Sequence, residues 1–186
     1  MLLQFTSVLC LATALTGTAA AQQFSVVVGE GPATSCYQNA MHGRSDLQSL
    51  QACNTALNAT INNRTDRRRT HVNRAVIYLA MDRPEQALAD LDRAVRMNLR
   101  GPEVDLNYSA AYLRLGRNED AIRAATRVLE ADYHRPHQAY FNRAIAHESM
   151  GDLVAAYDDF SRASELAPDW PAPRRELERF QVDSSS

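Results

Sequence analysis

Residues 142–168, NRAIAHESMGDLVAAYDDFSRASELAP, repeat a pattern that the chain also carries in residues 73–98, NRAVIYLAMDRPEQALADLDRAVRMN. A further copy begins at Asn107, so that Asn73, Asn107 and Asn142 follow one another in steps of 34 and 35 residues. A fixed repeat of this length predicts supersecondary units that stack side by side. We therefore expect one elongated repeat domain to fill most of the 186 residues.

Each copy contains two segments of about a dozen residues in which apolar residues recur at helical spacing. A short turn separates them, and Gly116 and Gly151 stand at this turn, where a left-handed backbone is expected. Asp82 takes the same place in the first copy. The pattern predicts an all-α protein built from helix–turn–helix units.

The spacing of small and bulky residues resembles the tetratricopeptide repeat. That family has a small residue and then an aromatic residue in its first helix, glycine at the turn, alanine, a bulky residue and alanine in its second helix, and a closing proline. The matching residues are Ala75, Tyr78, Ala87, Leu91 and Ala94 in the first copy, Ser109, Tyr112, Gly116 and Ala121 in the second, and Ala144, His147, Gly151, Ala156, Phe160, Ala163 and Pro168 in the third. The resemblance implies a right-handed α-solenoid that binds proteins or peptides and is not an enzyme.

The repeat register divides the chain into nine expected segments. They are a signal peptide (1–21), an extended arm (22–34), a degenerate hairpin similar to a tetratricopeptide repeat (35–57), an insertion loop (58–67), three repeats (68–101, 102–136 and 137–170), a capping helix (171–182) and a tail (183–186). The degenerate hairpin is included because residues 46–57 overlay residues 84–95. The capping helix is expected to cover the apolar face of the last repeat, as solenoids require.

The first 21 residues contain no charged side chain. Their apolar run, residues 8–15, is followed by small residues up to Ala21, a pattern typical of a secretory signal peptide. The run is shorter than the ~20 apolar residues of a membrane-spanning helix. We expect cleavage after about Ala21 and a secreted, periplasmic protein with no stable membrane insertion.

Cys36 and Cys53 are the cysteines that remain after such cleavage. An oxidising compartment favours a disulfide between them. In the repeat register Cys53 takes the place of Leu91, and Cys36 lies near the small residue of the first helix, so the two should be close. A thiol-redox role for the pair remains an alternative. A metal site with His42 lacks an evident fourth ligand, and no metal or cofactor is expected.

In the tetratricopeptide family the first helices line the concave face of the array. The residues expected there are Val72, Asn73, Val76, Leu106, Asn107, Ala110, Phe141, Asn142 and Ile145. Each asparagine amide offers two donors and an acceptor, which suits the backbone of an extended peptide. The apolar neighbours would supply pockets for its side chains. The alternative is that the asparagines only bridge adjacent helices.

Other classes of function find less support in the sequence. The formal net charge of -2 argues against a nucleic-acid partner, since such surfaces are strongly basic. No catalytic motif is apparent, so an enzyme is not expected. The expected partner is a protein or peptide of unknown identity. Self-association through residues 24–28, which have β propensity, is the structural alternative.

Overall fold

The computed structural model describes residues 33–59 and 63–180. These residues form α1 (Thr34–Met41), α2 (Leu47–Asn58), α3 (Arg64–Ala80), α4 (Pro84–Arg96), α5 (Pro102–Arg114), α6 (Asn118–Glu130), α7 (Pro136–Ser149), α8 (Leu153–Leu166), α9 (Pro171–Leu177) and a final 3-10 turn, η2 (Glu178–Phe180). No strand occurs in these two ranges. The predicted signal peptide, most of the predicted arm and the tail lie outside them.

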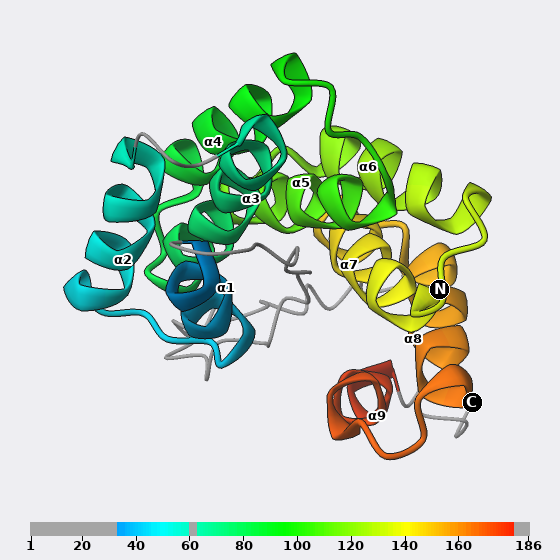
Figure 1. Cartoon of the computed structure of the whole chain (residues 1–186). Helices are drawn as coiled ribbons and strands as arrows, with labels where there is room; N and C mark the ends of the chain where they lie inside the picture. Colours follow the sequence, from blue (N-terminus) through cyan, green and yellow to red (C-terminus); the bar gives the residue numbers. More distant parts are fainter. Residues whose placement is uncertain (1–32, 60–62, 181–186) are drawn as a thin grey trace, which may run out of the picture.

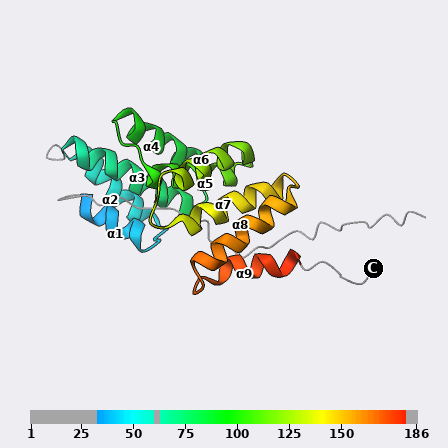
Figure 2. The ribbon, with the colours of Figure 1, turned by 90° about the vertical axis from the view of Figure 1, so that its right-hand side faces the viewer.

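The helices pair into consecutive hairpins that stack into an α-solenoid (Figure 1). In this view α2, α4, α6 and α8 lie along the outside of an arc, and α1, α3, α5 and α7 lie along its inside. The four inside helices, named here the inner layer, contact one another in chain order. Figure 2 shows the same stack from the side, with α9 at its C-terminal end. The predicted all-α solenoid fold is confirmed.

Local sequence signals set where the helices begin and end. Proline occupies the first turn of α4, α5, α7 and α9, where its missing N–H leaves no hydrogen bond unmade. The turns inside the three repeats have a left-handed residue, with φ of 67° at Gly116, 82° at Gly151 and 56° at Asp82. The predicted turn conformation is confirmed, including at the aspartate.

Small residues allow the helices of each hairpin to approach closely. In the first repeat Ala75, Ala87 and Ala94 have no exposed surface and pack around Leu91. In the third repeat Ala156 and Ala163 are equally buried on either side of Phe160. The alanines predicted from the family pattern therefore form the contact faces of the stack.

The predicted insertion loop, residues 58–67, is shorter in the structure. Helix α2 continues to Asn58, and α3 begins at Arg64. The side chain of Asn63 caps α3 by accepting a hydrogen bond from the backbone N–H of Asp66, at 2.8 Å. Because this cap starts the helix early, Arg64 and the arginines after it belong to α3 rather than to a loop.

The C-terminal cap is shorter than the predicted helix over residues 171–182. Helix α9 ends at Leu177 and is followed by η2. Trp170 packs on Phe141, with ring centroids 4.6 Å apart, and Ala172 is buried in the same cluster. Trp170 therefore packs at the junction between the third repeat and α9. None of the helices in residues 33–59 and 63–180 has both the length and the apolar composition of a membrane span.

Candidate protein-binding surface

The inner layer places the three repeat asparagines at one level of consecutive helices, Asn73 on α3, Asn107 on α5 and Asn142 on α7. Each has no exposed surface. The Nδ2 of Asn142 donates a hydrogen bond to the Oγ of Ser109, at 2.9 Å. This contact joins α7 to α5, which is the bridging arrangement that the sequence left open as an alternative.

The apolar residues beside the asparagines are also inside the protein. Leu106 packs with Val128 and Ala139, and Phe141 packs with Phe160 at a ring-centroid distance of 5.5 Å. Of the nine predicted groove residues, Ile145 is partly exposed and eight are buried. The buried residues are Val72, Asn73, Val76, Leu106, Asn107, Ala110, Phe141 and Asn142. The structure therefore does not place these eight on an open surface.

The physical reason is that a repeat helix is covered on more than one side. The residue before each asparagine points between its own hairpin and the next one, as the contact of Phe141 with Trp170 of the following turn shows. A single repeat has no following neighbour, so its pattern does not reveal this coverage. Only the stacked array decides how much of an inner helix stays exposed.

A hydrogen bond between buried side chains should be measurable at this position. We expect Asn142→Ala to lower the free energy of unfolding by about 1–3 kcal/mol, because it leaves the hydroxyl of Ser109 without this donor. Ser109→Ala and the double variant complete a thermodynamic cycle, read by urea denaturation. A coupling energy indistinguishable from zero would show that the bridge does not stabilise the stack.

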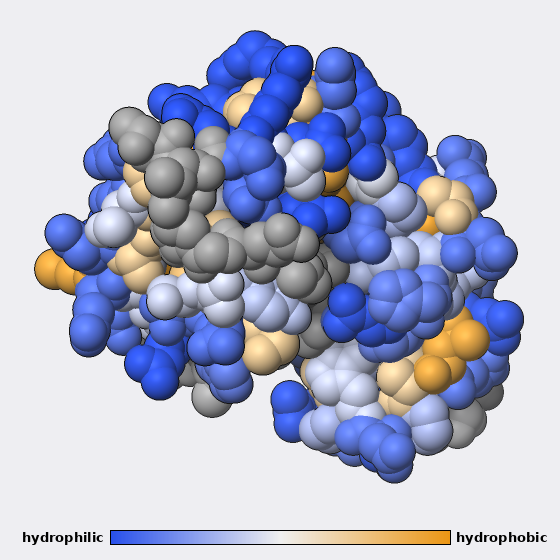
Figure 3. Space-filling model, viewed as in Figure 1, coloured by the Kyte–Doolittle hydropathy of each residue, from blue (hydrophilic) through white to orange (hydrophobic). Residues whose placement is uncertain are grey.

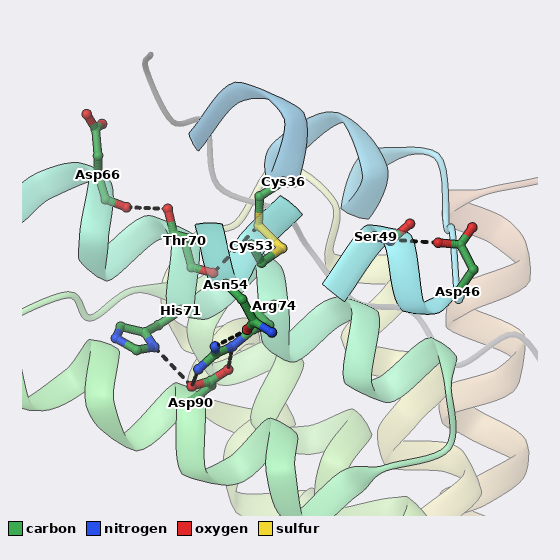
Figure 4. The surroundings of a disulfide bond; sticks show 10 residues. All are labelled: Cys36, Asp46, Ser49, Cys53, Asn54, Asp66, Thr70, His71, Arg74 and Asp90. Atoms are coloured by element: carbon green, nitrogen blue, oxygen red, sulfur yellow. Dashed lines mark hydrogen bonds and ion pairs between the residues drawn. A yellow bond between two sulfur atoms is a disulfide. The ribbon is translucent and has the colours of Figure 1, made fainter. Parts of the chain in front are cut away.

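A buried cluster of charged side chains lies in the first repeat. Asp90 on α4 has no exposed surface and accepts two hydrogen bonds from Arg74 on α3, at 2.6 and 2.8 Å. His71 Nδ1 lies 2.9 Å from the same carboxylate, and Arg93 donates to it at 3.0 Å. Arg74 also donates to Asn54 of α2, at 2.6 Å, so the cluster ties three helices together (Figure 4).

The third repeat contains the same ion pair, and the second does not. Arg143 on α7 donates to both oxygens of Asp159 on α8, at 2.7 and 2.8 Å. In the second repeat the corresponding residues are Tyr108 and Ala124. The Tyr108 hydroxyl donates instead to Asp92 of the preceding hairpin, at 2.7 Å, and burial together with this bond raises the pKa of Tyr108. The arginine–aspartate pairs join the two helices of one hairpin, whereas the Tyr108–Asp92 bond joins two successive hairpins.

These ion pairs were not identified from the sequence, although a signal was present. Arginine follows Asn73 and Asn142, and aspartate occurs 16 residues after each of these arginines. In the second copy both partners are replaced together. Such a joint change indicates contact between the two positions. It is visible within this one sequence, because the three repeats can be compared with one another.

The pH dependence of stability follows from the cluster. Burial opposes ionisation of Asp90, but the hydrogen bonds from Arg74 and His71 outweigh it and lower the pKa of the carboxyl below its ordinary value. Since the folded pKa is the lower one, the carboxylate contributes fully above the unfolded pKa of about 4, and its contribution is lost as the pH falls through the folded value.

We therefore expect the melting temperature to fall steeply below about pH 4. Scanning calorimetry from pH 7 to pH 2 measures this slope, with Asp90→Asn as the comparison variant. The variant should have a lower melting temperature at neutral pH and a shallower fall in acid. Parallel curves for the two proteins would assign the acid sensitivity to other carboxyl groups.

The disulfide predicted between Cys36 and Cys53 is present, with an S–S distance of 2.06 Å (Figure 4). It joins α1 to α2 and lies against Val76 and Ile77 of α3. Both cysteines have no exposed surface. Thiol exchange requires an attacking thiolate to reach a sulfur atom, so this burial argues for a structural role and against the redox alternative.

His134 and His137 lie three residues apart, in and just after the connection before α7. His134 lies beside Tyr133, with ring centroids 4.5 Å apart, and His137 lies 5.8 Å from the ring of Trp170. Burial lowers the pKa of His137. No group of three metal-binding side chains occurs in residues 33–59 or 63–180. The histidines of this region pack against aromatic rings.

Stacked antiparallel hairpins, with alanine at the helix contacts and a glycine or aspartate at the turns, define a helical-repeat scaffold of the kind that binds other proteins. The family model of the tetratricopeptide repeat matches residues 72–132 and residues 109–171. The chain belongs to this family, and the two matches overlap on the second repeat.

The chain is also similar to a curated protein over about half of its length. Peptidyl-prolyl cis-trans isomerase FKBP42 of Arabidopsis thaliana is 33% identical over 108 residues. The match covers 53% of this chain and 29% of the relative. Because the chain spans less than a third of that protein, the similarity does not transfer the activity in the relative's name.

Proposed function

We propose that the protein is a non-catalytic scaffold that binds a protein or peptide partner along its inner layer, in the oxidising environment of the cell envelope. The supporting observation is the stack of α3, α5 and α7, which contact one another in order and come from three consecutive repeats. In the tetratricopeptide family such arrays interact with proteins. The Cys36–Cys53 disulfide is consistent with an oxidising compartment.

We infer two roles for the predicted groove residues, according to their burial. Ile145 is partly exposed and would contact the partner directly. Asn142, through its bond to Ser109, sets the distance between α5 and α7. Asn73 and Asn107, at the equivalent positions, would keep the remaining inner helices in the register on which the binding surface depends. Partner contact with these buried amides themselves would require the inner layer to open.

The test is co-purification from chemically crosslinked cell envelope, with the protein expressed at its native level. Three variants are compared with the wild type: Ile145→Glu, the triple change of Asn73, Asn107 and Asn142 to alanine, and Leu47→Asn as a control at an exposed apolar residue of α2. Circular dichroism establishes that each variant is folded before recovery is compared.

A partner that is recovered with the wild type and with Leu47→Asn, and lost with Ile145→Glu, would support binding along the inner layer. Loss with the triple variant alone would assign the asparagines a role in spacing the helices. Recovery of the same partner with all variants would contradict the proposal and place binding on another face. A mass of two or more chains by light scattering, with no other protein recovered, would favour self-assembly.

A further inference from the structure

A second surface, at the C-terminal end of the array, carries large apolar side chains that face solvent. The α8 patch is defined here as Met150, Leu153, Val154 and Tyr157, which are 48%, 54%, 76% and 48% exposed. Figure 3 shows hydrophobic atoms on the side of the molecule where α8 lies. Single exposed apolar residues are ordinary, but a contiguous group of them marks an interaction site.

The internal repeats provide a control for this interpretation. At the positions of Leu153 and Val154 the second repeat has Asn118 and Glu119, and the first repeat has a proline followed by Glu85. Glu85 and Glu119 are exposed although further repeats follow them in the stack. The position of Val154 therefore faces solvent inside the array as well, so that stacking gives no reason for an apolar residue there.

The patch continues into a hollow between α8 and the C-terminal turn. A pocket of ≈ 420 Å³ is lined by Tyr157, Arg174, Leu177, Glu178 and Phe180. The rings of Tyr157 and Phe180 meet edge to face, with centroids 6.0 Å apart. Tyr157 therefore belongs to both features. Together they form an apolar surface along one helix with a shallow depression at its side, a shape that suits an amphipathic helix.

The charges around the patch favour a basic partner. Asp152 precedes Leu153, and Asp158 lies one turn after Val154, and both are exposed. Of the arginines nearby, Arg162 is paired with Glu165 at 2.9 Å. Arg174 donates to the carbonyl oxygen of Pro168 at 2.9 Å and shares the lining of the pocket with Glu178. An apolar centre with carboxylates on both sides attracts a segment whose apolar residues are flanked by arginine or lysine.

We propose that the α8 patch docks an amphipathic helix of another protein, with its apolar residues against Leu153, Val154 and Tyr157 and its basic residues against Asp152 and Asp158. This surface is separate from the inner layer. The proposal therefore stands or falls independently of the proposed function, and the two experiments change different residues.

The test uses a designed fluorescent peptide of about 14 residues. It has leucine at positions i, i+3, i+4 and i+7 and arginine at the flanking positions, and a matched peptide has glutamate in place of arginine. Binding is measured by fluorescence anisotropy at low ionic strength. The main variant combines Leu153→Asn with Val154→Gln; the second repeat carries asparagine and glutamate at these positions, and glutamine keeps the size of that glutamate without adding a charge that would attract the peptide. Leu47→Asn is the control, since Leu47 is 71% exposed on α2.

We expect the arginine peptide to bind the wild type and the Leu47→Asn variant equally, and the dissociation constant to rise at least about tenfold in the double variant. The proposal is overturned if the arginine peptide fails to bind at about 1 mM, if the glutamate peptide binds as well, or if the double variant binds unchanged. A dimer of the wild type that the double variant abolishes would assign the patch to a second copy of the chain and would also overturn it.

Discussion

Replacement of Asp90 by alanine is expected to lower the free energy of unfolding by about 3–5 kcal/mol, because it leaves the guanidinium of Arg74 largely buried and without its carboxylate. The loss should exceed that of most alanine substitutions at buried polar residues, since one carboxylate accepts from Arg74 and Arg93 and lies within hydrogen-bond distance of His71. Urea denaturation followed by circular dichroism measures the difference.

The second repeat supplies the compensating variant. It carries Tyr108 and Ala124 where the first repeat carries Arg74 and Asp90. The combination Arg74→Tyr with Asp90→Ala removes both charges, and it should recover part of the stability that Asp90→Ala alone loses. Glu85→Ala, at an exposed residue of the same helix, should cost no more than about 0.5 kcal/mol.

The comparison of single and double variants decides between two explanations. If the unpaired arginine is the cause, the double variant is more stable than Asp90→Ala. If the two are equally unstable, the loss comes from the volume of the missing side chain and not from charge. A change of less than about 1 kcal/mol in Asp90→Ala would show that the ion pair makes little net contribution.

Reduction of the Cys36–Cys53 bond is expected to destabilise the N-terminal hairpin by about 3 kcal/mol, because the bond closes a loop of sequence separation 17 and so limits the unfolded chain. The effect should be local. Helix α1 ends the described part of the array and has α2 and α3 as its partners, whereas α3 and α5 are held by hairpins on both sides.

Hydrogen exchange read by mass spectrometry measures this locality, with the Cys36→Ala and Cys53→Ala double variant compared with the oxidised wild type. Exchange should become faster in α1 and α2 and stay unchanged in α6 to α8. Reductant should have no further effect on the variant, which serves as its own control. Uniformly faster exchange along the chain would contradict a local role, and unchanged exchange in α1 would show that packing alone holds the hairpin.

The agreement between repeat register and redox chemistry explains why the disulfide could be predicted. The register placed Cys53 at the position of Leu91, which is buried in the first repeat, and it placed Cys36 on the neighbouring helix. A sequence repeat transfers positions from a well-defined unit to a degenerate one. The same reasoning located the turn at Asp82, where the backbone has a φ of 56°.

The groove residues show where this reasoning ends. Asn142 was expected to offer its amide to a peptide, yet in the structure it is buried and bonded to Ser109 of the preceding inner helix. A periodic pattern identifies which residues occupy equivalent positions. It does not tell whether the neighbouring helix leaves them exposed, because exposure depends on the distance and angle between hairpins.

The sequence by itself determined the helical-repeat class, the three repeats, their alanine contact faces and the pairing of Cys36 with Cys53, because each of these depends on spacing along the chain. The tertiary structure decided which polar side chains meet inside the stack, such as Asp90 with Arg74, and which apolar side chains stay outside it, such as Val154. Both depend on contacts between helices that are far apart in the chain, and these are fixed only when the hairpins pack.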